Sequence, residues 1–270
     1  MNDYIVVEGI KCYAPSLAGQ NDGFDKSEFE LLFEAEENSF WFKIRNKIIK
    51  YLFTKYSNQE KRTKLLEIGC GTGFVLQALS DLKNVDLTGS EIYLEGLFFA
   101  RKRLSSVELI QLDATNMPFV NAFDVIGAFD VMEHIAEDEK VMEMVHKALV
   151  EHGVFMMTVP QYPWMWSAQD EYAFHKRRYT RNELSTKLKK HGFEIQYLGS
   201  FVFTLFPVMV ISRIIKRKEN KNVMSEFEIP RILNWIFYAF MYADFILIRI
   251  GFSLPFGGSL VCVAGKKSKN

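Results

Sequence analysis

The sequence predicts an α/β fold: a Rossmann-like, mostly parallel sheet of seven strands with helices on both faces, an N-terminal helical cap, and a C-terminal helical insert between the last two strands. Two observations lead to this prediction. Short apolar runs alternate with amphipathic segments from residue 65 onwards, and a glycine-rich turn directly follows the first run. Strands alternating with helices form right-handed crossovers and a parallel sheet, which binds ligands at the carboxyl ends of its strands.

The residues before this alternation divide into an arm and a cap. Residues 1–25 show little periodicity and are expected to be irregular. Apolar residues then recur with helical spacing over 26–56, with Ser39 as a candidate break between two helices. The aromatic residues at 40–42 either pack a helix against the sheet or form a lid over the glycine-rich turn. In the second case Arg45 is free to meet a carboxylate.

The alternation then predicts the sheet itself. Strands are expected at 65–68, 85–89, 107–112, 123–129 and 154–159, with helices at about 75–82, 93–103 and 137–150. Two further strands, at 193–200 and 259–265, are expected to close the sheet.

The turn after the first strand carries glycines at alternate positions, Gly69, Gly71 and Gly73. Glycine lets a backbone turn sharply and approach a ligand closely, and the N–H groups of the helix beyond then face that ligand. A dinucleotide fingerprint requires glycine where Phe74 stands, so a nicotinamide or flavin site is disfavoured. Glu67 lies inside the preceding strand and requires a partner if it is buried.

Acidic residues follow the next strands. Glu91 lies 18 residues beyond Gly73, where a carboxylate can accept both hydroxyls of a ribose. Asp113 is placed to accept from an exocyclic amine, and Asp130 begins the segment after the fourth strand. A single such acid is more often a helix cap or a solvated residue, but acids at successive strand ends favour a binding edge.

These ordered motifs resemble those of class I S-adenosylmethionine-dependent methyltransferases. The resemblance rests on the segment 67–73, Glu91, Asp113 with its Pro-Phe sequel, and the segment 123–135, and covers about residues 25–200. The segments 40–45 and 158–167 resemble a bacterial type 11 or type 12-like subgroup often found with glycan-assembly enzymes.

The resemblance implies S-adenosyl-L-methionine as cofactor and S-adenosyl-L-homocysteine as product. The glycines would pass against the methionine part, Glu67 and Arg45 would approach its amino and carboxylate ends, and Glu91 would hold the ribose. The implied cofactor contacts are Arg45, Glu67, Gly69, Cys70, Gly71, Gly73, Glu91, Ile92, Asp113, Ala114, Phe129 and Asp130.

Methyl transfer from a sulfonium mainly requires in-line placement of the acceptor, with a general base only for a protonated acceptor such as a hydroxyl. His134 and His175 are the candidate catalytic bases. The alternative role for His134 is to orient or cap the helix that starts near Asp138. No His, Asp or Glu group shows clear metal-ligand spacing, although Glu133 and His134 could converge with Asp170 and His175, so we expect no metal.

The loop after the fifth strand is the expected acceptor-binding wall, because a long loop on the ligand-bearing edge is usually functional. Its basic residues favour an anionic acceptor group, or else they only order the loop by pairing with Asp170 and Glu171. The predicted acceptor residues are Tyr162, Trp166, Lys176, Arg177, Arg178 and Tyr179.

Roughly fifty residues separate the last two expected strands, where a short connection is usual in the resembled family. Two apolar runs, 201–215 and 232–250, lie there, separated by a basic cluster. The first is shorter than a bilayer requires and the second contains charges, so a spanning hairpin is disfavoured. The alternatives are a buried substrate lid, a homodimer surface, or helices in a membrane interface with the basic cluster on lipid headgroups.

The composition restricts the function further. Lys plus Arg and Asp plus Glu both number 33 in 270 residues, and no extended basic face exists, so nucleic acid is not an expected partner. Three widely separated cysteines fit a reduced, cytoplasmic setting, at the inner face of the membrane if the insert binds lipid. The N-terminus has neither a basic region nor a long apolar run, so no signal peptide is expected.

The expected divisions are an arm and cap at 1–58, a cofactor-binding core at 59–203, the apolar insert at 204–257 and a closing strand and tail at 258–270. The expected function is methylation, with O-methylation favoured, of a small-molecule, glycan or lipid-linked acceptor. The alternative is a non-catalytic, cofactor-binding scaffold near a membrane.

Overall fold

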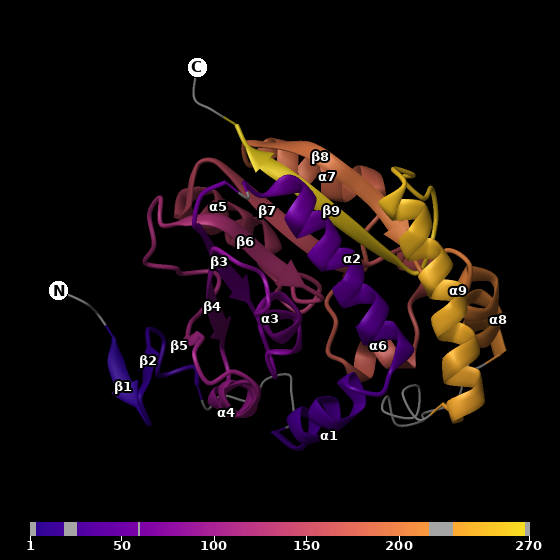
Figure 1. Ribbon diagram of the computed structural model, residues 1–270, viewed down its shortest axis with the longest axis horizontal. Helices are drawn as coiled ribbons and strands as arrows, with labels where there is room; N and C mark the ends of the chain where they lie inside the picture. The colour runs from indigo at the N-terminus through magenta and orange to yellow at the C-terminus, as the bar shows by residue number, and fades with distance from the viewer. Residues whose placement is uncertain (1–3, 19–25, 59, 216–228, 268–270) are drawn as a thin grey trace.

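The computed structural model describes residues 4–18, 26–58, 60–215 and 229–267, and it places one sheet between two layers of helices (Figure 1). The described strands are β1 (Ile5–Val7), β2 (Ile10–Cys12), β3 (Thr63–Ile68), β4 (Val85–Glu91), β5 (Glu108–Gln111), β6 (Phe123–Phe129), β7 (Leu149–Pro160), β8 (Phe193–Phe201) and β9 (Ser259–Lys266). The helices are α1 (Lys26–Glu36), α2 (Phe40–Tyr56), α3 (Phe74–Leu79), α4 (Leu94–Arg103), α5 (Asp138–Ala148), α6 (Ala168–Tyr172), α7 (Arg181–Lys190), α8 (Phe206–Ile215) and α9 (Arg231–Arg249).

The strand order is β1-β2-β5-β4-β3-β6-β7-β9-β8. The chain moves outward from β3 through β4 to β5, then returns to place β6 and β7 on the other side of β3, all in parallel. The order therefore reverses between β3 and β6, and a crevice opens at their carboxyl ends. Strand β9 closes the sheet antiparallel to both β7 and β8.

The expected Rossmann-like fold is confirmed, but the strand count was wrong because the N-terminal arm is not irregular. Strands β1 and β2 form a hairpin around Glu8 and Gly9, which have φ angles of 48° and 80°. Two successive positive φ angles are typical of a two-residue hairpin turn. Strand β2 then pairs in parallel with β5 and extends the sheet to nine strands. Three-residue strands are too short to show an alternating pattern.

The core lies on both faces of the sheet. Buried residues of α2, α3 and α4 pack on one face, together with residues of α9, and buried residues of α5 and α7 pack on the other. The expected break in the cap is confirmed, since the Ser39 hydroxyl accepts a hydrogen bond from the Trp41 amide and begins α2.

The insert docks on the cap through its second helix. Asn234 of α9 accepts a hydrogen bond from the Phe40 amide at 2.9 Å. The ring centroid of Phe237, also in α9, lies 5.4 Å from that of Phe40. Asp244 is fully buried and accepts from the Phe203 and Thr204 amides at 2.6 and 3.1 Å. Figure 1 shows α9 running beside α2, with α8 behind it.

By length and composition α9 is long and apolar enough to cross a membrane, and it is the one such helix in the described part of the chain. Only 17% of its most apolar window is buried within the protein. The basic cluster of Lys216, Arg217, Lys218 and Lys221 lies outside the described residues.

Candidate active site

A cavity of about 710 Å³ lies at the crevice between β3 and β6. One end is formed by the glycine-rich turn, and the other by the loops after β6 and β7. The cap and the insert form the side walls, with Trp41 and Phe42 from α2 and Val208, Met209, Leu233 and Phe237 from the insert. The aromatic segment at 40–42 therefore packs against the core and also lines the cavity, and its role as a lid stays a prediction.

The backbone of the glycine-rich turn faces this cavity. Gly69, Gly71 and Gly73 have φ angles of 64°, 50° and 79°, which strain any residue with a side chain. A Cβ on Gly69 would meet Val131 Cγ2 at 2.5 Å, whereas a Cβ on Gly71 would enter open space. The turn therefore requires glycine for its shape, and at Gly71 it leaves room for a ligand.

Glu67 presents a buried carboxylate with one unpaired oxygen near the end of β3. It is 2% exposed, and its Oε2 atom has no hydrogen-bond partner. Burial raises the pKa of Glu67 well above its ordinary value, and the nearby Glu36 and Glu91 oppose the lowering effect of Arg45. A buried, unsatisfied oxygen that lines a cavity fits a cationic ligand group such as an ammonium.

Glu91 connects the end of β4 to the glycine-rich turn. One of its oxygens accepts from the Gly71 amide at 3.0 Å, and the other accepts from the Ile92 and Tyr93 amides at 2.8 and 3.3 Å. Burial raises the pKa of Glu91, while these amide contacts lower it. An ionised carboxylate offers about four acceptor positions, so Glu91 retains capacity for a ligand hydroxyl.

Arg45 is already paired with a carboxylate of the protein itself, whereas the lid interpretation left it free to meet one. Its Nη1 donates to Asp130 at 2.6 Å, and its guanidinium lies over the rings of Trp41 and Phe42 at 4.8 and 5.2 Å. This pair joins the cap to the loop after β6 and lines the cavity. Cys70 and Phe129, both predicted cofactor contacts, also line it.

Four predicted cofactor residues near the adenine end, together with Gly73, lie outside the described lining of the cavity. These four are Glu91, Ile92, Asp113 and Ala114. The N-terminal segment packs over this edge, since the Tyr13 and Ala14 amides donate to Gln111 at the end of β5. Asp113 accepts from the amide and hydroxyl of Thr115 in a local turn. Their roles toward adenine and ribose stay predictions.

A buried hydrogen-bond network of Glu36, Thr72 and Arg103, which the sequence analysis did not identify, holds the glycine-rich turn. Arg103 of α4 pairs with Glu36 of α1 and donates to the Thr72 hydroxyl at 2.5 Å, while that hydroxyl donates to Glu36. Burial raises the pKa of Glu36. Glu36 and Arg103 are 67 residues apart, and no local pattern connects them.

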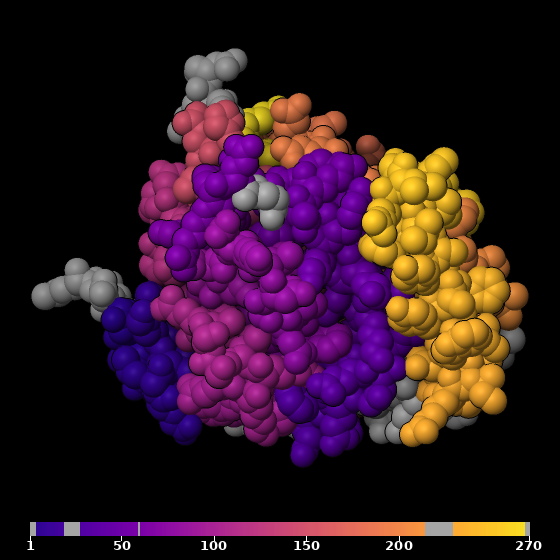
Figure 2. All heavy atoms as spheres, viewed as in Figure 1, coloured from indigo at the N-terminus to yellow at the C-terminus, as the bar shows by residue number. Residues whose placement is uncertain are grey.

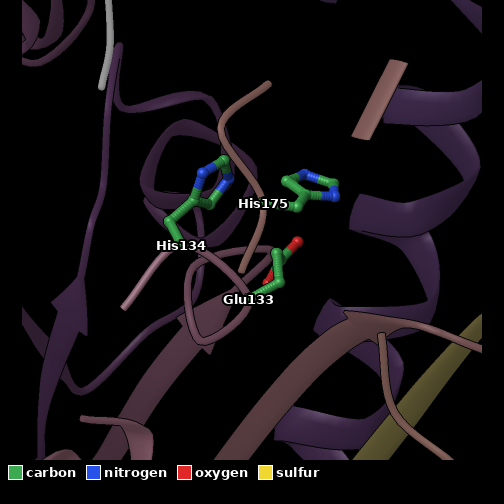
Figure 3. Close-up of side chains that lie close together, drawn as sticks. All are labelled: Glu133, His134 and His175. Carbon is green, nitrogen blue, oxygen red and sulfur yellow. The ribbon is translucent and has the colours of Figure 1, made fainter. Parts of the chain in front are cut away.

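At the other end of the cavity, two loops bring Glu133, His134 and His175 together. One ligand-type atom from each lies within 4.8 Å of the others. The imidazole rings are perpendicular, 4.7 Å apart, and Figure 3 shows the Glu133 carboxylate beside them. The Lys176 amide donates to the Glu133 carbonyl at 2.6 Å and ties the two loops together.

Each member of this cluster has a distinct environment. Nδ1 of His175 lies 2.9 Å from Asp170, which also accepts from Arg178 Nε at 2.7 Å. Burial and the neighbouring His175 lower the pKa of His134 to about 3, so its imidazole is neutral near pH 7. Burial and the nearby Asp130 raise the pKa of Glu133 well above its ordinary value. His134 hydrogen-bonds to the Ala173 backbone and does not cap α5.

Of the six residues predicted to bind the acceptor, only Arg178 lines the cavity, and it is paired with Asp170. Arg177 and Tyr179 bond to Asp138, so they order the loop. The others also lie outside the described lining: Lys176 is exposed, Trp166 donates to Glu171, and the Tyr162 ring packs on Trp164 and Phe206.

The chain matches known proteins over most of its core. The profile of a family described as methyltransferase domain matches residues 59–228. A probable S-adenosylmethionine-dependent methyltransferase of Mycolicibacterium smegmatis is 26% identical over 62% of this chain and 64% of its own length. A demethylmenaquinone methyltransferase of Chlorobaculum tepidum is 26% identical over 38% of this chain. The chain thus spans 64% of the first relative's length and 43% of the second's.

Solved structures show the same fold at low sequence identity. Phosphoethanolamine N-methyltransferase 2 of Haemonchus contortus, in complex with S-adenosyl-L-methionine, has a TM-score of 0.60 and 15% identity, covering 94% of this chain and 60% of its own. The [4+2]-cyclase SpnF has a TM-score of 0.55 and 17% identity, covering 83% of this chain and 81% of its own. The family match extends over more than half of the sequence, and the chain belongs to the methyltransferase-domain family of class I S-adenosylmethionine-dependent methyltransferases.

Proposed function

We propose that this protein transfers the methyl group of S-adenosyl-L-methionine to an oxygen atom of a small-molecule, glycan or lipid-linked acceptor. One observation carries the proposal: a single cavity joins the carboxylate of Glu67, whose Oε2 atom is unpaired, to the cluster of Glu133, His134 and His175. A cofactor held at the first end points its sulfonium toward the second, where an acceptor must present its nucleophile in line.

The residues at the cofactor end match the groups of S-adenosyl-L-methionine. Glu67 can accept from the ammonium, which would give its buried oxygen a partner. Gly71 leaves space for the methionine chain, and Glu91 keeps acceptor capacity for a ribose hydroxyl. Arg45, paired with Asp130, lies where it can approach the cofactor carboxylate.

The acceptor end combines apolar walls with titratable groups. The insert supplies Val208, Met209, Leu233 and Phe237 to the wall, which suits an acceptor with a large apolar part. The cluster of Glu133, His134 and His175 suits a hydroxyl, because a hydroxyl must lose its proton when methylated. In the transfer an O–CH₃ bond forms, the S–CH₃ bond breaks with its electron pair passing to sulfur, and the proton leaves to solvent.

The outer face of the insert supports contact with a membrane surface. Ile232 and Trp235 of α9 are 78% and 72% exposed, and Ile211 of α8 and Ile250 are also exposed. Arg231 and Arg249 are exposed at the two ends of α9. An apolar helix face with an aromatic residue and basic ends is typical of helices that lie in a lipid interface. Figure 2 shows α9 along one outer edge of the molecule. We propose that the protein acts at the inner face of the membrane, next to a lipid-linked acceptor.

Incubation with methyl-labelled cofactor and extracts from its host tests the reaction. Label in a lipid fraction that resists mild alkali indicates a methyl ether, whereas alkali-released methanol indicates a methyl ester, and label on an amine contradicts the oxygen acceptor. Wild-type protein that binds the cofactor but labels no fraction supports the non-catalytic scaffold.

A further inference from the structure

We propose that Glu133, His134 and His175 bind a divalent transition-metal cation such as Zn²⁺, with one carboxylate oxygen and two imidazole nitrogens as ligands. Their ligand atoms lie within 4.8 Å of one another in the described structure. Ligand atoms that lie about 2.0–2.2 Å from Zn²⁺ lie about 3–4 Å from one another. Side-chain movements of about 1 Å would therefore bring these three ligand atoms to coordinating distance. The site faces the cavity.

Glu133 provides an independent sign of a ligand. It is 1% exposed, and its Oε2 atom has no hydrogen-bond partner. A buried carboxylate oxygen without a partner is costly, and buried charges are normally paired or bound to metals. A cation between the carboxylate and the two imidazoles would satisfy this oxygen.

The surroundings of the histidines are those of metal ligands. Nδ1 of His175 lies 2.9 Å from Asp170, which leaves Nε2 for a cation. The ring of His134 likewise hydrogen-bonds to the Ala173 backbone and keeps its second nitrogen. Metal-bound histidines almost always donate their other ring N–H to a carboxylate or a backbone carbonyl, which fixes their orientation. Asp170 is itself held by Arg178 at 2.7 Å.

The charge of the cavity and the number of ligands indicate which cation fits. Among the described lining residues, six are Asp or Glu and three are Arg, so acidic groups outnumber basic ones. Two imidazoles and one carboxylate suit Zn²⁺, Fe²⁺ and related ions better than Mg²⁺ or Ca²⁺, which prefer oxygen ligands. Three protein ligands leave coordination positions open, as in catalytic metal sites.

In the reaction, and resting on the proposed function, the open position would hold the acceptor oxygen. A cation there would lower the pKa of a hydroxyl held by the site and so favour loss of its proton to solvent. His134 and His175 would then serve as ligands in place of the general-base roles expected for them.

Isothermal titration of EDTA-treated, tag-free protein with Zn²⁺, and visible absorption with Co²⁺, test the site directly. We expect one bound ion per chain and a thermal stabilisation by Zn²⁺. His134→Ala and His175→Ala each remove a ligand, and the isosteric Glu133→Gln replaces a charged ligand with a weaker, neutral one. Loss of a supporting residue costs about 10–100-fold in metal affinity, so we expect at least about 100-fold for each.

His191→Ala is the matched control, because His191 pairs with Glu139 away from the cavity. This variant should bind Zn²⁺ as the wild type does. Wild-type protein that binds neither Zn²⁺ nor Co²⁺, or binding that persists in the His134 and His175 variants, would overturn the metal site. Binding of S-adenosyl-L-homocysteine is measured in parallel. Methyl transfer unaffected by EDTA refutes the metal's role in the reaction alone, and Zn²⁺ binding without cofactor binding refutes the proposed function alone.

Discussion

Replacing Glu67 with glutamine should stabilise the ligand-free protein and weaken its binding of cofactor. Glutamine has nearly the shape of a protonated glutamate, so the buried space at the end of β3 stays filled. The change removes only the ability to carry charge. Since Glu67 is 2% exposed and its Oε2 atom is unpaired, this charge is costly without a ligand and useful with one.

The stability effect has a defined sign. Burial raises the pKa of Glu67 well above its unfolded value, so over the interval between the two values the native state holds a proton that the unfolded state lacks. Stability therefore falls as pH rises through this interval, and each unit of pKa shift corresponds to about 1.4 kcal/mol. Glu67→Gln lacks this loss, so the variant should be more stable than the wild type above the raised pKa.

The binding effect follows from one charge-assisted contact. A hydrogen bond to a charged group contributes about 1.5–3 kcal/mol, and 1.4 kcal/mol is a factor of ten in affinity. Glu67→Gln should therefore raise the dissociation constant for S-adenosyl-L-homocysteine by about 10- to 150-fold.

Thermal unfolding of ligand-free protein between about pH 5 and pH 9 measures the first effect, and isothermal titration calorimetry measures the second. The difference between wild type and variant isolates Glu67 from the other buried acids. The exposed Glu151 of β7 provides the control, since Glu151→Gln should change neither quantity. A Glu67→Gln variant with unchanged cofactor affinity would refute the proposed contact. A variant that is less stable than the wild type at high pH would refute the claim that the buried charge destabilises the ligand-free protein.

Three further changes test other parts of the structure. Glu91→Ala should abolish cofactor binding by calorimetry, because its carboxylate holds the glycine-rich turn and is the predicted ribose ligand; unchanged affinity would contradict this. Ile232→Ser with Trp235→Ser should reduce sedimentation with anionic liposomes while the circular dichroism spectrum stays unchanged, whereas Val120→Ser, also an exposed apolar residue, should not; a shift from dimer to monomer on gel filtration would instead indicate a subunit interface. Tyr179→Phe loses a buried hydrogen bond to the first residue of α5 and should cost about 1–3 kcal/mol in the free energy of unfolding by denaturant titration, with cofactor affinity retained; an unchanged free energy of unfolding would contradict this structural role.

Sequence patterns were most reliable where a feature depends on neighbouring residues. The strand at 123–129 was predicted with its observed bounds, and the division of the cap at Ser39 follows from a local capping contact. The β1–β2 hairpin was missed because its strands have three residues each. Its position in the sheet depends on pairing with β5, which lies about a hundred residues away.

The loop at 161–179 shows the limit of residue type as a guide. Its basic and aromatic residues suggested an acceptor wall, yet Arg177, Arg178 and Tyr179 mostly satisfy buried acids. Their side chains order the loop, and in doing so they bring His175 to the cavity. The loop still lines the cavity through Gln169, Asp170, Tyr172, Ala173, His175 and Arg178, and the insert, whose helix α9 lies against the cap, adds apolar residues to the wall.

The sequence by itself determined the fold class, and it predicted the cofactor end of the site. Glycines within one turn and acids directly after strands are local features, and a parallel sheet necessarily brings its strand ends to one edge. Tertiary structure alone decided that Glu133 and His134 meet His175, that Glu36 meets Arg103, and that the insert closes the cavity. These contacts join segments tens of residues apart, and only the packing of helices and loops on the sheet specifies such distances.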